Sequence, residues 1–347
     1  MQVDFRIIYL KKRFPLRISR GVRDGQYNLF VSISDQGHTG WGETSPGETE
    51  GTATAEAAQS QLEGFLRSVT IKQSIHKVYD TALKHKVAPC ALAALDMALW
   101  DLKAKKAQMP LYQLLGVSKP QHPTSITLGI MAPEEARQRL PLLLKEQHIN
   151  TLKVKLGSNE GIEADKAMYH EVLHYHKKHP ISIRVDANGG WNVTEAKHMM
   201  QWLSEHNCAY VEQPLKEGEE HYLPELFKNR PLPIFVDESC RFATDIPKWA
   251  DAVDGVNLKL MKCGGITGAL RIIATAQAHQ LKTMIGCMGE TSISIAAGAA
   301  VSGALHHIDL DSHLNLDPDP CEGAPLVNGI TMPLDIPGHG GAFKSAT

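Results

Sequence analysis

The sequence predicts an α/β fold, a parallel TIM-like β/α barrel that carries an α+β capping domain formed by the N-terminal region and the C-terminal tail. Two observations predict it. From Ser125 onward, eight short apolar segments alternate with amphipathic stretches, and they start 21 to 32 residues apart, enough for one strand, one helix and two loops. The first hundred residues lack this alternation. We therefore expect a capping domain over residues 1–120, a barrel with the functional site over residues 121–315, and a tail over residues 316–347 that packs on the capping domain.

The N-terminal region is expected to begin with a small antiparallel meander, because three segments have strand character and a turn separates the last two. These strands are Met1–Tyr9, Tyr27–Asp35 and Thr39–Glu43, with a loop at Arg17–Gln26 between the first two. Helices follow. The clearest runs from Cys90 to about Ala107, where leucines recur at helical spacing after a proline that can begin a helix.

The barrel strands are expected where short apolar runs end in polar residues. They are Ser125–Ile130, Thr151–Leu156, Ile183–Asn188, Tyr210–Pro214, Ile234–Ser239, Gly255–Leu260, Lys282–Cys287 and His306–Asp311. An open doubly wound sheet is the alternative, but such a sheet usually has a glycine-rich phosphate turn near its start, and none is found here. The tail, Leu316–Thr347, is rich in Gly and Pro and is expected to return to the N-terminal region as loops.

Composition narrows the function classes. The 347 residues include 36 basic and 38 acidic side chains, a formal net charge of −2, so no basic field suits a nucleic acid partner. No apolar run is long enough to span a bilayer, and the N-terminus has basic residues after its apolar stretch, the reverse of a signal peptide. The six cysteines are scattered without a C-x-x-C pair, which argues against a zinc ribbon or disulfide scaffold. We expect a cytoplasmic protein with a small-molecule partner.

Three carboxylates end three consecutive predicted strands: Asp186, Glu212 and Asp237. Strand ends converge at the mouth of a barrel, where three acids would repel one another unless a cation lay between them. Oxygen-only ligands favour Mg²⁺ first and Mn²⁺ second. A single acid here would be explained as a surface carboxylate or helix cap, but three in register favour a metal site.

Three lysines suit proton transfer at the same mouth. Lys153 and Lys155 are two residues apart, so both leave one face of their strand, and Lys259 lies four strands further round the barrel. Two amines on opposite sides of a bound substrate could remove a proton from one face of a carbon and return one to the other. A nearby cation and a second lysine would lower the pKa of such an amine into a useful range. The ordinary alternative for a K-x-K pair is a solvated strand edge.

Several motifs together resemble the enolase superfamily, in its muconate-lactonising branch, over essentially the whole chain. They are Gly40–Glu43, Ala94–Asp101, Lys153–Lys155, Asp186–Trp191, Val211–Pro214, Asp237–Ser239 and Asn257–Gly265. Sites of this superfamily are known to use a lysine or histidine base with Mg²⁺ on an enediolate. The resemblance implies that Asp186, Glu212 and Asp237 hold Mg²⁺, that Lys153 stabilises the enediolate, and that Lys155 and Lys259 exchange the α-proton of the L and D isomers.

The branch includes cycloisomerases, o-succinylbenzoate synthases, N-acylamino acid racemases and dipeptide epimerases. Asp309 and Asp311 on the eighth strand resemble the D-x-D of the dipeptide epimerases, which holds the free α-ammonium of a dipeptide; the nearby Asp317-Pro318-Asp319 shows that the spacing also arises by chance. The resemblance therefore implies a dipeptide epimerase, on L-Ala-D/L-Glu or a related dipeptide, in recycling of cell-wall peptide. The rest of the branch stays an alternative, and a non-catalytic binding protein is a remote one.

Three further residues bear on the substrate. By the same resemblance, Arg20 pairs with an acidic side chain on the epimerised residue, and Thr127 lines that pocket. Gly289 stands where the family often carries a larger apolar residue, so we expect a wider pocket there. A homo-oligomer is also expected.

Overall fold

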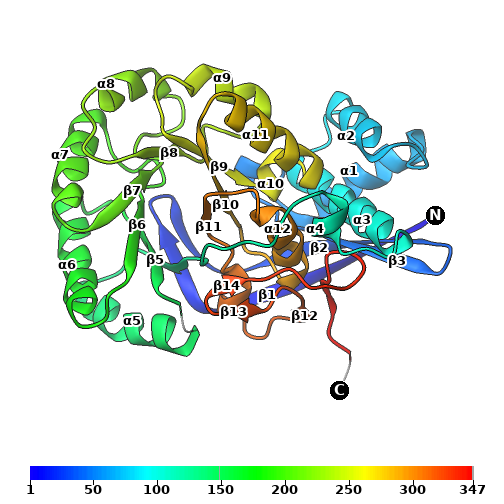
Figure 1. The fold of residues 1–347 in the computed structure, drawn as a ribbon, viewed down its shortest axis with the longest axis horizontal. Helices are drawn as coiled ribbons and strands as arrows, with labels where there is room; N and C mark the ends of the chain where they lie inside the picture. The colour runs from blue at the N-terminus through cyan, green and yellow to red at the C-terminus, as the bar shows by residue number, and fades with distance from the viewer. Residues whose placement is uncertain (148, 346–347) are drawn as a thin grey trace.

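Eight parallel strands form the barrel wall in the computed structural model, which describes residues 1–147 and 149–345 (Figure 1). They are β4 (Ile126–Leu128), β5 (Thr151–Lys155), β6 (Ser182–Asp186), β7 (Cys208–Glu212), β8 (Ile234–Val236), β9 (Gly255–Lys259), β10 (Lys282–Gly286) and β11 (His307–Ile308). Their order in the sheet is their order in the chain. In the described part of the chain, one parallel bridge between Thr124, just before β4, and Ile308 of β11 closes the ring of strands. The predicted barrel is confirmed.

Helices cover the outside of the barrel, as the alternating pattern predicts (Figure 1). They are α5 (Pro133–Gln147), α6 (Ile162–Lys178), α7 (Val193–Ser204), α8 (Leu223–Phe227), α9 (Ile246–Trp249), α10 (Leu260–Cys263), α11 (Ile266–Ala278) and α12 (Ser292–Ser302), with 3-10 turns at Glu220–Tyr222, Ala243–Asp245 and Ser312–Asn315; a further 3-10 turn, Glu48–Glu50, lies in the N-terminal region. Every residue of β5 and β9 is buried, because one face of each strand fills the barrel and the other meets the helices. No helix in the described part of the chain is long and apolar enough to cross a bilayer.

The N-terminal region folds as the predicted meander of β1 (Gln2–Ile18), β2 (Gly21–Asp35) and β3 (His38–Thr44), followed by helices α1 (Ala55–Ser68), α2 (Ile75–Lys84), α3 (Pro89–Lys106) and α4 (Leu111–Leu114). The predicted helix at Cys90–Ala107 is α3. Gly40 and Gly42 on β3 pack so closely against α3 that a β-carbon on either would clash with the helix backbone. The glycines therefore allow the sheet and this central helix to meet.

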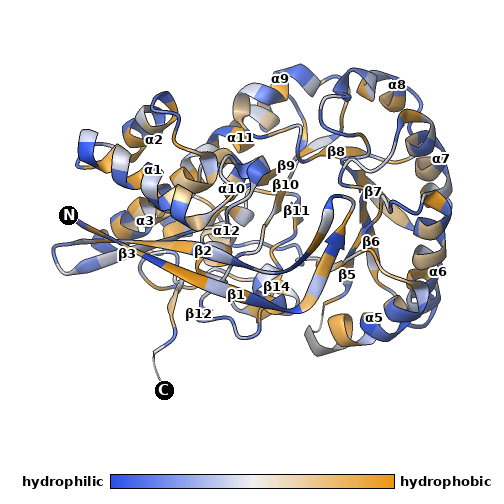
Figure 2. Cartoon of the chain, turned by 180° about the vertical axis from the view of Figure 1, so that it is seen from behind, coloured by the Kyte–Doolittle hydropathy of each residue, from blue (hydrophilic) through white to orange (hydrophobic). Residues whose placement is uncertain are grey.

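The loop predicted at Arg17–Gln26 is wrong, because β1 and β2 continue as a long hairpin to Ile18 and Gly21. Leu16 pairs with Arg23 and Ile18 with Gly21, and Gly21 has a φ of 139°, which only glycine adopts readily at a tight turn. Figure 2 shows the two strands reaching from the N-terminal sheet across to β5 and β6. The hairpin tip thus lies over the barrel mouth.

The tail is not made of loops alone. It contains two short antiparallel pairs, β12 (Cys321–Glu322) with β15 (Ala342–Phe343), and β13 (Leu326–Val327) with β14 (Ile330–Thr331). The Phe343 ring lies 4.9 Å from Phe30 and 5.2 Å from Trp41, measured between ring centroids. Because these two partners belong to β2 and β3, aromatic contact holds the end of the tail on the N-terminal sheet.

Candidate active site

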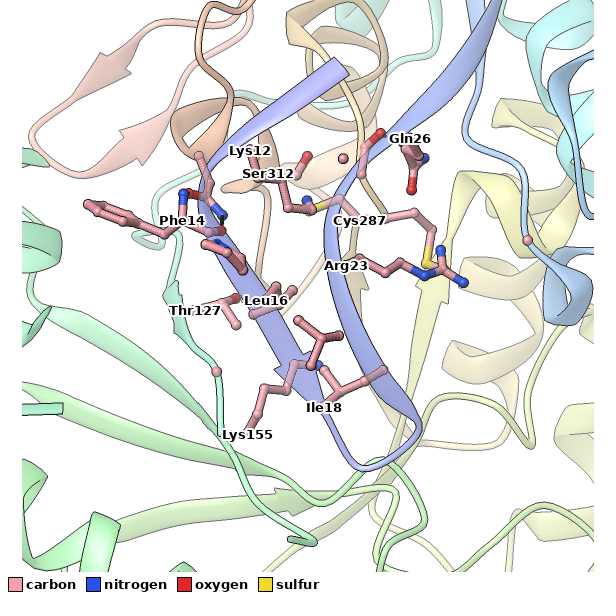
Figure 3. A pocket seen from close by; sticks show the side chains of 18 of the residues that line it. Lys12, Phe14, Leu16, Ile18, Arg23, Gln26, Thr127, Lys155, Cys287 and Ser312 are labelled. Atoms are coloured by element: carbon pink, nitrogen blue, oxygen red, sulfur yellow. Dashed lines mark hydrogen bonds between the residues drawn. The ribbon is translucent and has the colours of Figure 1, made fainter. Parts of the chain in front are cut away.

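A pocket of about 700 Å³ lies between the carboxyl ends of the barrel strands and the β1–β2 hairpin (Figure 3). The lysines predicted from the sequence, Lys153, Lys155 and Lys259, line it together with Asp309 and Asp311. Arg20 and Thr127 line it as well. The structure therefore brings together residues that are up to 291 positions apart in the chain, from Arg20 to Asp311.

The three predicted metal ligands form one cluster. Asp186, Glu212 and Asp237 are buried, and each offers a carboxylate oxygen within 4.8 Å of the others. Burial, together with the charge of Asp186, raises the pKa of Glu212 to about 8. Among the described residues, Glu212 Oε2 and Asp237 Oδ2 accept no hydrogen bond of normal geometry, although a lysine amine lies 2.8 Å from each. Carboxylate oxygens that lack hydrogen bonds and repel one another are suitable ligands for a hard divalent cation.

Other buried groups hold these carboxylates in place. Asn257 Nδ2 donates to Glu212 Oε1 at 2.7 Å, and the backbone N–H of Asn188 donates to Asp186 Oδ1 at 2.8 Å. Lys262 binds Asp237 through both its carboxylate and its backbone carbonyl. Sequence reasoning missed these three positioning roles. All three residues lie within the motifs Asp186–Trp191 and Asn257–Gly265, but the sequence alone does not show which carboxylate each of them contacts.

Lys153 is a fixed ammonium at the centre of the site. Its Nζ lies 2.8 Å from Glu212, 2.9 Å from Asp309 and 3.1 Å from Asp186. Burial alone would lower the pKa of Lys153, but these carboxylates outweigh it and raise the pKa well above the usual value. A permanently charged group here can stabilise negative charge on a substrate and is poorly suited to act as a base.

Lys155 and Lys259 flank the pocket on β5 and β9, four strands apart in the eight-stranded sheet. Lys155 Nζ lies 2.5 Å from Asp186 Oδ2, and Lys259 Nζ lies 2.8 Å from Asp237 Oδ2. Burial opposes the charge of Lys259, but Asp237 outweighs it and raises the pKa of this lysine. The lowered pKa expected for Lys259 therefore does not arise from the side chains alone. It would require a cation that shares the charge of Asp237.

Asp309 and Asp311 are not equivalent. Asp309 accepts from Ser125 Oγ at 2.5 Å and from Lys153, and although burial favours its neutral form, Lys153 outweighs this and lowers its pKa. Asp311 Oδ2 accepts the Thr127 backbone N–H at 2.7 Å, while among the residues that the structure describes Oδ1 has only the thiol of Cys287, at 3.7 Å. Burial and the charge of Asp309 raise the pKa of Asp311 to about 6. Of the two acids, Asp311 is the one with an oxygen available to a ligand.

The remaining predicted features lie on or against the hairpin. Arg20 Nη2 is 2.6 Å from Glu238 Oε1, and Nη1 donates to the Asn188 carbonyl at 3.0 Å. The role of Arg20 toward an acidic substrate stays a prediction, because its guanidinium is already paired. The space beside Gly289 is filled by Gln26, whose side chain would lie 2.9 Å from an added β-carbon, so the pocket is not widened there as expected.

Comparison with known proteins gives matches along almost the whole chain. Residues 3–116 match the family described as "Mandelate racemase / muconate lactonizing enzyme, N-terminal domain", and residues 134–346 match "Enolase C-terminal domain-like". The chain is 60 % identical to a protein named hydrophobic dipeptide epimerase from Flavobacteria bacterium (strain MS024-2A), over 99 % of both chains. It is 58 % identical to a protein of the same name from Roseobacter litoralis, over 100 % of both.

Solved structures are similar too. A dipeptide epimerase from Enterococcus faecalis, complexed with Mg and L-Leu-L-Tyr, has a TM-score of 0.89 and 32 % identity over 98 % of this chain and 99 % of that one. A substrate-liganded L-Ala-D/L-Glu epimerase from Bacillus subtilis has a TM-score of 0.91 and 27 % identity over 100 % of this chain and 99 % of that one.

Proposed function

The chain belongs to the mandelate racemase/muconate lactonizing enzyme family of the enolase superfamily, and from this membership we propose that it is a metal-dependent dipeptide epimerase, an isomerase that inverts the α-carbon of the second residue. One observation carries the proposal. Lys155 and Lys259 face a single pocket from opposite sides, and Asp311 in the same pocket has a carboxylate oxygen available for a substrate ammonium.

The reaction needs two proton carriers in opposite protonation states. When Lys155 is neutral it takes the α-proton from one face of the L isomer, and the electron pair of the C–H bond moves onto the substrate carboxylate. Lys259, as an ammonium, then delivers a different proton to the opposite face and gives the D isomer; the reverse reaction exchanges their roles. The charge of Lys153 stabilises the enediolate between these two steps.

The acid cluster supports a divalent metal ion as the cofactor. Asp186, Glu212 and Asp237 would hold Mg²⁺, with Mn²⁺ as the second candidate, and the ion would supply a Lewis acid for the substrate carboxylate. All three carboxylates are fully buried, so an ion held by them would be shielded from bulk water.

The pocket supports an apolar second residue. Leu16 and Ile18 of the hairpin line the pocket together with Met288, whose sulfur lies 3.7 Å from Lys259 Nζ. Arg20, the cation expected to receive an acidic side chain, is paired with Glu238. The relatives named for hydrophobic dipeptides support the same choice. L-Ala-L/D-Glu stays the second candidate, and turnover of dipeptides from cell-wall peptide or other sources is the implied role.

A dipeptide library incubated in D₂O with Mg²⁺ tests the proposal. We expect deuterium at the α-carbon of the second residue only, with inversion, and fastest exchange with apolar second residues. Exchange into N-acetyl amino acids in preference to dipeptides would replace the proposal with an N-acylamino acid racemase. Binding without any exchange would indicate a non-catalytic protein.

A further inference from the structure

Lys12 is a buried lysine that the proposed reaction does not use. It lies on β1, has 8 % of its surface exposed and lines the pocket. Among the described residues, no side chain or carbonyl forms a hydrogen bond or ion pair with its amine. Figure 3 shows it beside Cys287 and Ser312, at the end of the pocket away from Lys155.

The direction of this side chain follows from the strand. Side chains alternate along β1, so Lys11 is exposed on one face and Lys12 is buried on the other. A lysine usually extends its amine to water, and burying an unpaired ammonium is costly. The pKa of Lys12 is lowered first by burial and then by Arg23 on the neighbouring strand, while Cys287 and Asp311 oppose this. An anion at this end of the pocket would therefore gain a counter-charge that the protein has already desolvated.

The proposed reaction places one part of the substrate here. If Asp311 holds the α-ammonium, the side chain of the first residue begins one bond away from that ammonium carbon. Lys155 lies at the other end of the pocket, where the second residue would be held between it and Lys259 (Figure 3). The first side chain is thus the substrate group nearest to Lys12.

We propose that Lys12 is a specificity residue that binds the side-chain carboxylate of an acidic first residue, so that dipeptides such as L-Glu-L-Leu are substrates. The proposal rests on the proposed epimerase function. The physical reason is charge balance: Asp311 neutralises the α-ammonium of the substrate, and an acidic side chain on its first residue neutralises Lys12. An apolar first residue leaves this amine unpaired, and a cationic one is repelled by it.

The test measures kcat/KM of the Mg²⁺-loaded enzyme for L-Glu-L-Leu, its neutral isostere L-Gln-L-Leu, and L-Leu-L-Leu. Lys12→Met should lower the value for L-Glu-L-Leu roughly 10-fold or more relative to L-Leu-L-Leu, mainly through KM, because a hydrogen bond to a charged group is lost. L-Gln-L-Leu should lose less. Lys11→Met removes an exposed lysine from the same strand and should change none of the three.

The outcomes separate the two proposals. If wild type turns over L-Leu-L-Leu but Lys12→Met lowers all three values equally, the assignment of Lys12 is overturned and the epimerase function stands. If wild type turns over none of the dipeptides, both are overturned. Should Lys12→Met fail to fold, judged by its melting temperature, Lys12→Gln carries the same expectations.

Discussion

Replacing Asp311 with Asn should weaken the handling of free dipeptides and leave substrates without an ammonium almost unaffected. Asp311 is buried, and its Oδ2 accepts the Thr127 N–H at 2.7 Å. An asparagine can keep this bond with its carbonyl oxygen. Its NH₂ group would then face the substrate ammonium, donor against donor, where Oδ1 now offers an acceptor. The substitution removes a charge and keeps the local fold.

The size of the effect follows from this geometry. A hydrogen bond to a charged group contributes about 1.5–3 kcal/mol, which corresponds to a loss of roughly 10- to 100-fold in kcat/KM. Glycyl-L-leucine and N-acetyl-L-leucine form the matched pair, because they differ only in the ammonium. We expect at least about a tenfold loss for the first, in the range given by the charged hydrogen bond, and little change for the second.

The assay is loss of optical activity or chiral chromatography of each compound, over a range of pH. Since burial and Asp309 raise the pKa of Asp311 to about 6, the carboxylate is ionised above that pH and protonated below it. The wild-type KM for glycyl-L-leucine should therefore rise as the pH falls through 6, and the KM for N-acetyl-L-leucine should not. Asp309→Asn is the contrasting variant: it removes a partner of Lys153 and should harm both substrates. Equal losses for both substrates in Asp311→Asn would refute the reasoning.

Three other predictions address the metal, the bases and the hairpin. Glu212→Gln should abolish activity with little change in melting temperature, and chelation should do the same reversibly; full activity after exhaustive chelation would contradict the metal assignment. Lys155→Ala and Lys259→Ala should each stop net epimerisation, yet by the proposed roles the first should still exchange the α-proton of the D isomer and the second that of the L isomer, as read by mass spectrometry in D₂O; wild-type epimerisation in either would rule out the two-base scheme. Arg20→Ala should raise the KM for L-Ala-L-Glu far more than for L-Ala-L-Leu if Arg20 meets an acidic side chain; equal changes would instead assign it to holding the hairpin through Glu238.

The barrel could be predicted because its strands carry two superimposed signals. Val154 and Leu258 belong to short buried runs, and Lys155 and Lys259 follow them at the strand ends. Few other arrangements explain charged residues inside apolar segments that recur at a regular interval. The length of the hairpin could not be predicted, because the polar sequence around Arg20 resembles a loop until its partner strand is known.

Within the site, the residue types could be predicted but their inequality could not. Asp309 and Asp311 look alike in the sequence, but Ser125, just before β4, and Lys153 on β5 both bind Asp309. Lys12 is hidden in the basic run Lys11–Arg13, which reads as a solvated charge cluster. Its burial depends on strand alternation and on the barrel beneath, neither of which local sequence records.

The bridge between Thr124 and Ile308 has a consequence for how the barrel resists opening. One backbone bridge alone holds the first and last strands together only weakly, and side-chain hydrogen bonds reinforce it. Thr124 Oγ1 accepts the Leu310 backbone N–H at 2.8 Å, Asp309 accepts the Ser125 hydroxyl, and Asp311 accepts the Thr127 backbone N–H. Asp311, which we propose binds the substrate ammonium, and its neighbour Asp309 therefore also help to hold the first and last strands of the barrel together. A substitution that loses these hydrogen bonds should impair both substrate recognition and the closure of the barrel, whereas one that keeps them, such as Asp311→Asn, should affect recognition alone.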